Sequence, residues 1–243
     1  MSQYANYERG GNVSSSPSRI TWAVQRLILA NIVVFAGQLI VSTAAGGFVQ
    51  HWLEFRPADL LRGVFWTPLT YMFMHAGLLH LFVNMLWLFF FGPDVERVLS
   101  TRQFFRFYLF CGAAGVMATF VPYLLRQSNP TILGASGAVM GVLAAFAVAN
   151  PNREFFLFPL PFPINARAMV ALVVVLNVAM AFTDAAVSVA THLGGLLAGY
   201  VYMKAAPWFT RGGRRGGGGG GDNDRDPLAE AVDNIFRFED RKR

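Results

Sequence analysis

Six hydrophobic segments, separated by short polar connections, fill the middle of this chain. Each has a length near the roughly 17–25 apolar residues that a helix needs to cross a bilayer. They cover about residues 20–43, 68–92, 103–125, 133–150, 167–183 and 187–206. The pattern predicts an all-α, polytopic membrane protein that is built as a bundle of six transmembrane helices.

The two ends of the chain read differently from the middle. Residues 1–19 are polar and rich in Ser, without the pattern of a cleavable signal peptide, so we expect the first hydrophobic segment to remain as an anchor. After Trp208 a run of Arg and Gly predicts a flexible linker. We therefore predict an N-terminal tail (1–19), a six-helix membrane domain (20–206) and a Gly-rich C-terminal tail (207–243). The stretch 227–243 fits either a short amphipathic helix or a disordered tail.

Composition agrees with a membrane protein and narrows its partners. Hydrophobic residues make up 54% of the chain and charged residues 14%, with a net charge of +6. The basic residues lie between hydrophobic segments rather than on one face, so we expect the lipid bilayer and no nucleic acid as a partner. Their excess on one side of the membrane predicts a multi-pass protein with both termini in the cytoplasm. Because no targeting segment is recognisable, we expect it in the cell membrane. The sequence does not indicate an oligomeric state.

Cysteine usage excludes two kinds of stabilisation. The chain has one cysteine, Cys111, inside a hydrophobic segment. An intramolecular disulfide and a Cys-based zinc site are therefore impossible, and Cys111 is expected to be a small buried apolar residue. We predict no metal and no cofactor. The connection 44–66 is longer than a turn requires and carries Trp52 and Trp66, which predicts an ordered element at the membrane interface.

Strongly polar residues inside hydrophobic segments are costly, so each is a candidate for function. They are His75, His80 and Asn84 in the second segment, Ser136 with its flanking Gly134 and Gly137 in the fourth, and His192 in the sixth. Each also has a structural explanation. The spacings of Gly137 with Gly141 and of Gly195 with Gly199, for example, are typical of close helix packing.

Together these residues form a pattern of nucleophilic catalysis. A serine hydroxyl becomes a nucleophile when a neutral imidazole within hydrogen-bond reach takes its proton, which makes Ser136 the candidate nucleophile and His192 the candidate base. Ser136 is expected near the N-terminal end of its helix, where free N–H groups favour a developing oxyanion. His80 and Asn84 share one helix face, and we place Asn84, His80 and Gly134 on the oxyanion side.

A third, acidic member of the site is not evident. No Asp or Glu falls within the fourth or sixth segment, and Asp184 is the nearest in sequence. We therefore predict a Ser-His dyad in which packing alone orients His192.

With these polar motifs in this order, the chain resembles the rhomboid family of intramembrane serine proteases. The matching strings begin at His75, which leads through His80 and Asn84 to Gly92 and Glu96-Arg97, and continue with Gly134-Ala-Ser136-Gly137 and with His192-Leu-Gly-Gly-Leu-Leu-Ala-Gly199. The resemblance covers about residues 20–206. It implies an endopeptidase that acts on transmembrane protein substrates.

The resemblance also implies roles for particular positions. His75 and Gly137 would support the site, the segment 167–183 would be a lateral gate, and the loop from Asp184 to Val187 would be a lid. Two positions depart from the family pattern. Met140 stands where many relatives have an aromatic ring under the catalytic His, and Thr67 follows Trp66 where an Arg or Gln is common.

Three alternatives compete with a serine protease. A non-catalytic rhomboid-like protein that binds membrane clients would typically lack the Ser or the His, and both are present here. A transporter or channel would carry acidic residues at depth and internal repeats. A zinc metalloprotease is disfavoured because His75 and His80 are five residues apart with no Glu between them.

Overall fold

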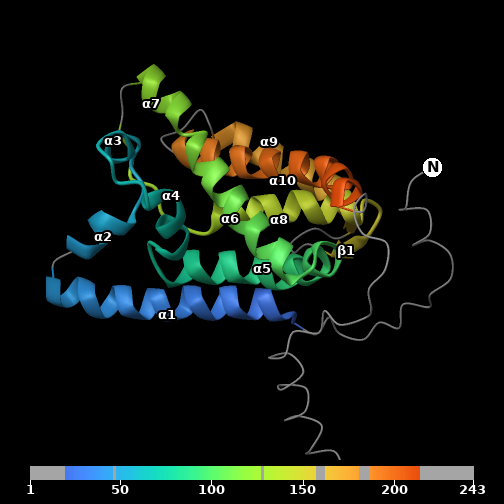
Figure 1. Ribbon diagram of the computed structural model, residues 1–243, viewed down its shortest axis with the longest axis horizontal. Coiled ribbons are helices and arrows are strands. Elements are labelled where there is room, and N and C mark those ends of the chain that lie inside the picture. Colours follow the sequence, from blue (N-terminus) through green and yellow to red (C-terminus); the bar gives the residue numbers. More distant parts are fainter. Residues whose placement is uncertain (1–19, 46–47, 127–128, 157–161, 181–185, 214–243) are drawn as a thin grey trace, which may run out of the picture. The chain divides into compact units, whose positions relative to one another are not determined.

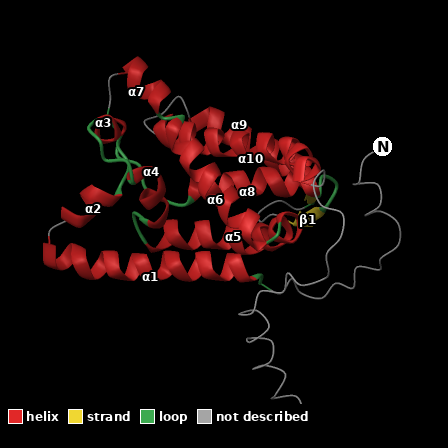
Figure 2. Ribbon diagram, viewed as in Figure 1, coloured by secondary structure: helices red, strands yellow, loops and turns green. Residues whose placement is uncertain are grey.

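The computed structural model describes residues 20–45, 48–126, 129–156, 162–180 and 186–213 (Figures 1 and 2). The predicted N-terminal tail, most of the C-terminal tail and Asp184 lie outside these residues. The chain divides into two units, residues 1–205 and 206–243. The helix contacts that follow belong to the first unit.

Helices make up most of the described chain, so the predicted helical class is confirmed. The elements are α1 (Trp22–Ala45), α2 (Phe48–Leu53), α3 (Pro57–Leu61), α4 (Thr67–Thr70), the 3-10 helix η2 (Tyr71–Phe73), α5 (Leu78–Leu99), α6 (Thr101–Met117), α7 (Phe120–Arg126), α8 (Ser136–Ala149), β1 (Glu154–Phe156), β2 (Pro163–Asn165), α9 (Ala166–Met180) and α10 (Ala186–Gly213). The two strands pair in antiparallel fashion between α8 and α9.

Three stretches of helix among the described residues are long and apolar enough to cross a membrane. They are Trp22–Ser42, Leu78–Leu99 and Thr101–Leu125, in α1, α5 and the consecutive pair α6 and α7. Helices α8 and α9 are apolar but shorter, at 14 and 15 residues. The count of six transmembrane helices therefore stays a prediction.

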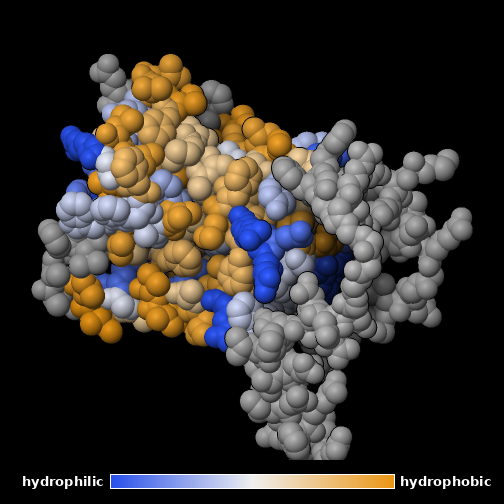
Figure 3. Space-filling model, viewed as in Figure 1, coloured by the Kyte–Doolittle hydropathy of each residue, from blue (hydrophilic) through white to orange (hydrophobic). Residues whose placement is uncertain are grey.

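Large apolar side chains remain on the outer surface of the long helices. Ile40 in α1 is 71% exposed and Leu79 in α5 is 75% exposed. Apolar residues cover much of the visible face of the first unit (Figure 3). A surface of this kind is unfavourable in water and suits a hydrocarbon environment.

The predicted second hydrophobic segment, 68–92, is wrong as a single helix. Its first residues form α4 and η2, and α5 begins only at Leu78 and runs on to Leu99. The side chain of Gln38 holds the intervening bend, because its Nε2 donates to the His75 carbonyl over 2.7 Å and its Oε1 accepts from the His75 N–H over 3.1 Å. Hydrophobicity alone does not reveal this bend, because the residues on both sides of it are mostly apolar.

A buried carboxylate joins α1 to the junction of α5 and α6. Glu96 is 4% exposed, and its two oxygens accept the Ala23 and Val24 N–H groups, each over 3.1 Å. Its Oε1 also accepts from Thr101 Oγ1 over 2.8 Å. The first N–H groups of a helix have no partner within the helix, and a negative charge near them is attracted to the positive end of the helix dipole. Glu96 therefore caps α1.

Glycines bring α8 and α10 into backbone contact. A Cβ added to Gly195 would lie 2.0 Å from the Gly137 carbonyl oxygen, and one added to Gly199 would lie 2.3 Å from the Gly141 carbonyl oxygen. Helix α6 also approaches α10 closely, because a Cβ on Gly115 of α6 would lie 2.8 Å from the Thr191 carbonyl oxygen of α10. The close helix approach that the glycine spacings predict is confirmed.

The connection between α1 and α4 is ordered in its described part, as predicted. Trp66 Nε1 donates to the Trp52 carbonyl over 2.7 Å, and the two indoles stack. Phe55 and Ile132 exchange backbone hydrogen bonds of 2.9 and 2.8 Å. The connection therefore holds the extended residues that lead into α8.

Candidate active site

The structure brings the two candidate reacting groups into contact. Ser136 is the first residue of α8, and His192 lies in α10. His192 Nε2 is 2.9 Å from Ser136 Oγ, which is a normal hydrogen-bond distance. Both residues are half-buried. The contact is possible because the glycine seam, formed by Gly137 and Gly141 of α8 with Gly195 and Gly199 of α10, lies directly beside it.

The backbone before Ser136 is fixed by Gly134. This residue has a φ of 115°, in the left-handed region that favours glycine, and its N–H donates to the Tyr71 carbonyl over 3.0 Å. A Cβ at Gly134 would lie 2.6 Å from Cε1 of His80. The His80 ring of α5 therefore packs on the backbone two residues before Ser136.

The start of α8 offers hydrogen-bond donors to an anion. The first N–H groups of this 14-residue helix have no acceptor within the helix, and they lie at the positive end of its dipole. On α5, Asn84 is buried and its Nδ2 donates to the His80 carbonyl over 2.8 Å. An amide NH₂ group has two hydrogens, and this bond uses one of them.

His75 lies beside His80 rather than beside Ser136. Its ring meets the His80 ring edge-on, with centroids 5.2 Å apart, and the residue is fully buried. Its Nδ1 is 3.4 Å from the Phe73 carbonyl oxygen. Among the described residues its Nε2 has no hydrogen-bond partner. His75 is thus separated from the Ser136 backbone by the His80 ring, and the supporting role that the resemblance implies for it stays a prediction.

The remaining predicted positions lie on α8 and α6. Gly137 faces α10, because a Cβ there would lie 3.0 Å from the Thr191 methyl group. Met140 is half-buried on the next turn, and its support of His192 stays a prediction. Cys111 is buried, as predicted, and packs against Gly141. No group of three or more metal-ligating side chains occurs in the described part of the chain.

The structure shows a second polar partner of His192, which the sequence did not predict. His192 Nδ1 is 2.9 Å from Oδ1 of Asn177, a residue of α9 that is 7% exposed. The prediction that packing alone orients His192 is therefore wrong. The expected third member was an acidic residue, whereas the partner is a neutral amide. The signal was one Asn within the otherwise apolar segment 167–183.

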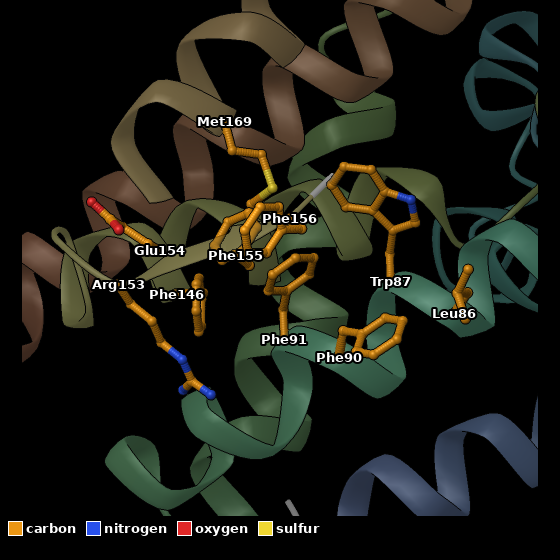
Figure 4. A pocket seen from close by; sticks show the side chains of 10 residues that line it. All are labelled: Leu86, Trp87, Phe90, Phe91, Phe146, Arg153, Glu154, Phe155, Phe156 and Met169. Atoms are coloured by element: carbon orange, nitrogen blue, oxygen red, sulfur yellow. The ribbon is translucent and has the colours of Figure 1, made fainter. Parts of the chain in front are cut away.

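The structure also has a pocket of about 300 Å³ that is separate from Ser136. Aromatic rings of α5, Phe146 of α8 and residues of β1 line it, with Arg153 and Glu154 at one side (Figure 4). Phe146 is ten residues from Ser136, which corresponds to about 15 Å along a helix. The pocket therefore lies toward the opposite end of α8 from Ser136.

Comparisons with known proteins find a matching family model and several similar proteins. A family model described as the Rhomboid domain matches residues 62–207. Rhomboid protease GluP of Bacillus subtilis is 33% identical over 144 residues, which cover 58% of this chain and 26% of that protein. Rhomboid protein 1, mitochondrial, of Saccharomyces cerevisiae is 35% identical over 134 residues, which cover 54% of this chain and 38% of that protein.

The presenilin-associated rhomboid-like protein, mitochondrial, of Bos taurus is similar to the same degree, with 35% identity over 136 residues that cover 54% of this chain and 35% of that protein. The chain thus matches between about a quarter and two fifths of the length of these relatives. The family model covers more than half of this chain and includes all the predicted site residues. With its long apolar helices, the chain is an integral membrane protein and belongs to the rhomboid family.

Proposed function

We propose that this protein is an intramembrane serine endopeptidase that hydrolyses peptide bonds in or near transmembrane segments of membrane proteins. Ser136 is the nucleophile and His192 is the general base. The observation that carries the proposal is the 2.9 Å contact between Ser136 Oγ and His192 Nε2, made between two different helices at the N-terminus of α8.

The reaction follows from this arrangement. His192 Nε2 takes the hydroxyl proton as Ser136 Oγ attacks the substrate carbonyl, and the tetrahedral intermediate carries a negative oxygen. The Ser136 N–H and the second amide hydrogen of Asn84 are the donors for that oxygen, and His80 lies against the adjacent backbone. His192 then returns the proton to the leaving amine, and water hydrolyses the acyl-enzyme in the same way.

The substrate has to unwind before it can react. A transmembrane helix pairs all its backbone amides internally, so the scissile carbonyl becomes accessible only when the local helix opens. Gly disfavours the helix by about 1 kcal/mol relative to Ala. Substrates with Gly or other weak helix formers near the cut are therefore preferred.

In the proposed topology the protein spans the membrane six times, and both termini lie on the cytoplasmic side. The transmembrane helices are α1, α5, α6, α8, α9 and α10. The relatives include a bacterial protein and two mitochondrial ones, so the cell membrane stays a prediction. Protease protection of tags at either terminus, in membranes of known orientation, tests the topology.

The test of the reaction uses purified full-length protein in liposomes with a single-span test substrate. The parent is expected to cleave the substrate and to react with a serine-directed fluorophosphonate, and Ser136→Ala and His192→Ala are expected to do neither. Ser42→Ala is the matched control, because Ser42 bonds only to Leu39 of its own helix in the described structure. Cleavage that persists in Ser136→Ala would refute the proposal, and a folded parent that neither cleaves nor reacts would favour the non-catalytic alternative.

A further inference from the structure

We propose that Asn177 is a positioning residue that holds the neutral His192 ring in the tautomer with its proton on Nδ1, so that Nε2 faces Ser136 as an acceptor. This inference rests on the proposed function for its catalytic consequence. Its structural basis, a chain of three hydrogen bonds through α9, α10 and α8, stands independently of any activity.

The orientation of the Asn177 amide follows from its second bond. Asn177 Nδ2 donates to the Val173 carbonyl over 2.8 Å. A carbonyl oxygen can only accept, so the NH₂ group has to be at this end of the amide. A reversed amide would place two oxygens in contact at a buried site, which is costly without a donor. The atom that faces His192 is therefore the oxygen Oδ1.

The orientation of the amide determines the proton position on the imidazole. An amide oxygen is only an acceptor, so the Nδ1 atom 2.9 Å away has to carry a hydrogen. A neutral imidazole carries one hydrogen, which leaves a lone pair on Nε2. The Ser136 hydroxyl then donates to Nε2 across 2.9 Å. This is the ground state from which Nε2 can take the proton.

The other tautomer of His192 is disfavoured at both ring nitrogens. With the hydrogen on Nε2, the Nδ1 lone pair would face the Asn177 oxygen, and Nε2 could no longer accept from Ser136. Because Asn177 is 7% exposed, water does not readily replace the lost bond. Asn177 thus excludes the tautomer that cannot act as a base.

An amide suits this place better than a carboxylate. A charged group in an apolar environment is much more costly than a neutral polar group. An amide oxygen orients the ring without that cost, although it stabilises the imidazolium less than a carboxylate would. The proposal therefore concerns orientation and tautomer rather than a charged third member.

The test compares Asn177→Leu with Asn177→Asp in the full-length protein. Leu removes the acceptor at similar volume, and kcat for the single-span substrate is expected to fall by roughly 100-fold or more with KM little changed, since a wrongly held imidazole loses most of its activity as a base. Asp keeps an oxygen toward Nδ1 and is expected to restore most of the rate. As a carboxylate it would also stabilise the imidazolium and move the acidic limb of the kcat profile to higher pH.

Asn31→Leu is the matched control. Asn31 is fully buried in α1, and its amide makes the same bond to the carbonyl four residues earlier, over 2.8 Å to Leu27. The loss of this hydrogen bond in Asn31→Leu is expected to lower the melting temperature without a fall in kcat. A similar kcat in Asn177→Leu and Asn31→Leu would overturn the proposal.

A second readout does not need activity. The ¹⁵N spectrum of the imidazole rings, with the His192 signal assigned by its absence in His192→Gln, is expected to show Nδ1 protonated and Nε2 bare in the parent, and a mixture in Asn177→Leu. A parent with hydrogen on Nε2 would overturn the inference. If the parent has the expected tautomer but Ser136 does not react, the proposed function fails while the role of Asn177 in fixing the tautomer stands.

Discussion

The glycine seam between α8 and α10 makes the most quantitative prediction. In Gly195→Ala, the new Cβ would start 2.0 Å from the Gly137 carbonyl oxygen and 2.7 Å from its carbon. Cβ atoms essentially never approach other atoms closer than 3.0 Å. Because the atoms on the other side belong to the backbone, no side-chain rotation relieves the contact. The two helices therefore have to separate by at least about 1 Å.

This separation acts directly on the proposed reacting groups, Ser136 and His192. Gly195 is one helical turn from His192, and Gly137 follows Ser136. A hydrogen bond of 2.9 Å that lengthens by about 1 Å is no longer a hydrogen bond. A misplacement of this size costs about 100-fold in rate, and overpacking of this kind costs about 1–3 kcal/mol of stability.

The assay measures kcat on the single-span substrate in liposomes, together with the melting temperature of each variant. Gly37→Ala is the matched control, because a Cβ on Gly37 in α1 has nothing within 4 Å. This control is expected to keep the parental rate and to be equally or slightly more stable, since Ala favours a helix more than Gly does. A Gly195→Ala protein that cleaves within twofold of the parent would refute the idea that backbone contact sets the distance.

Two further predictions concern the supports of the site. Glu96→Ala removes the acceptor for two N–H groups of α1 and is expected to lower stability by about 1–3 kcal/mol, whereas the exposed Glu154→Ala changes little; equal melting temperatures would contradict the capping role. Gly134→Ala is expected to lower kcat more than Gly63→Ala, because both glycines have positive φ but only the Cβ at Gly134 would strike the His80 ring. Equal rates in these two variants would show that backbone strain, and not contact with His80, explains any loss.

The sequence predicts the seam and the contact between Ser136 and His192 for a clear physical reason. Polar atoms are costly inside apolar segments, so Ser136 and His192 stand out wherever they occur. The glycine spacing beside each of them is a local property of its helix, and two smooth helix faces can meet closely in few ways. Local patterns of this kind can be read without knowledge of the fold.

The sequence does not reveal features that depend on which helices become neighbours. Asn177 is one polar residue in an apolar segment, and only the packing of α9 beside α10 makes it a partner of His192. The bend before α5 depends on Gln38, which is 37 positions from His75. The contact of Phe55 with Ile132 likewise joins residues far apart in the chain. Such long-range pairs leave no periodic signal in a single sequence.

The environment explains why the site is held by backbone contacts and amides. In an apolar interior, a carboxylate beside His192 would be costly unless it were paired and hydrogen-bonded. Glu96 meets that condition, because its two oxygens accept three hydrogen bonds at the end of a helix. His192 instead has the neutral Asn177 on one side and the glycine seam on the other. A substitution at the seam should therefore misplace the proposed base, His192. A substitution at Asn177 should leave His192 in place with its proton on the wrong nitrogen. Only the substitution at Asn177 should therefore change the tautomer ratio of His192 in a folded protein.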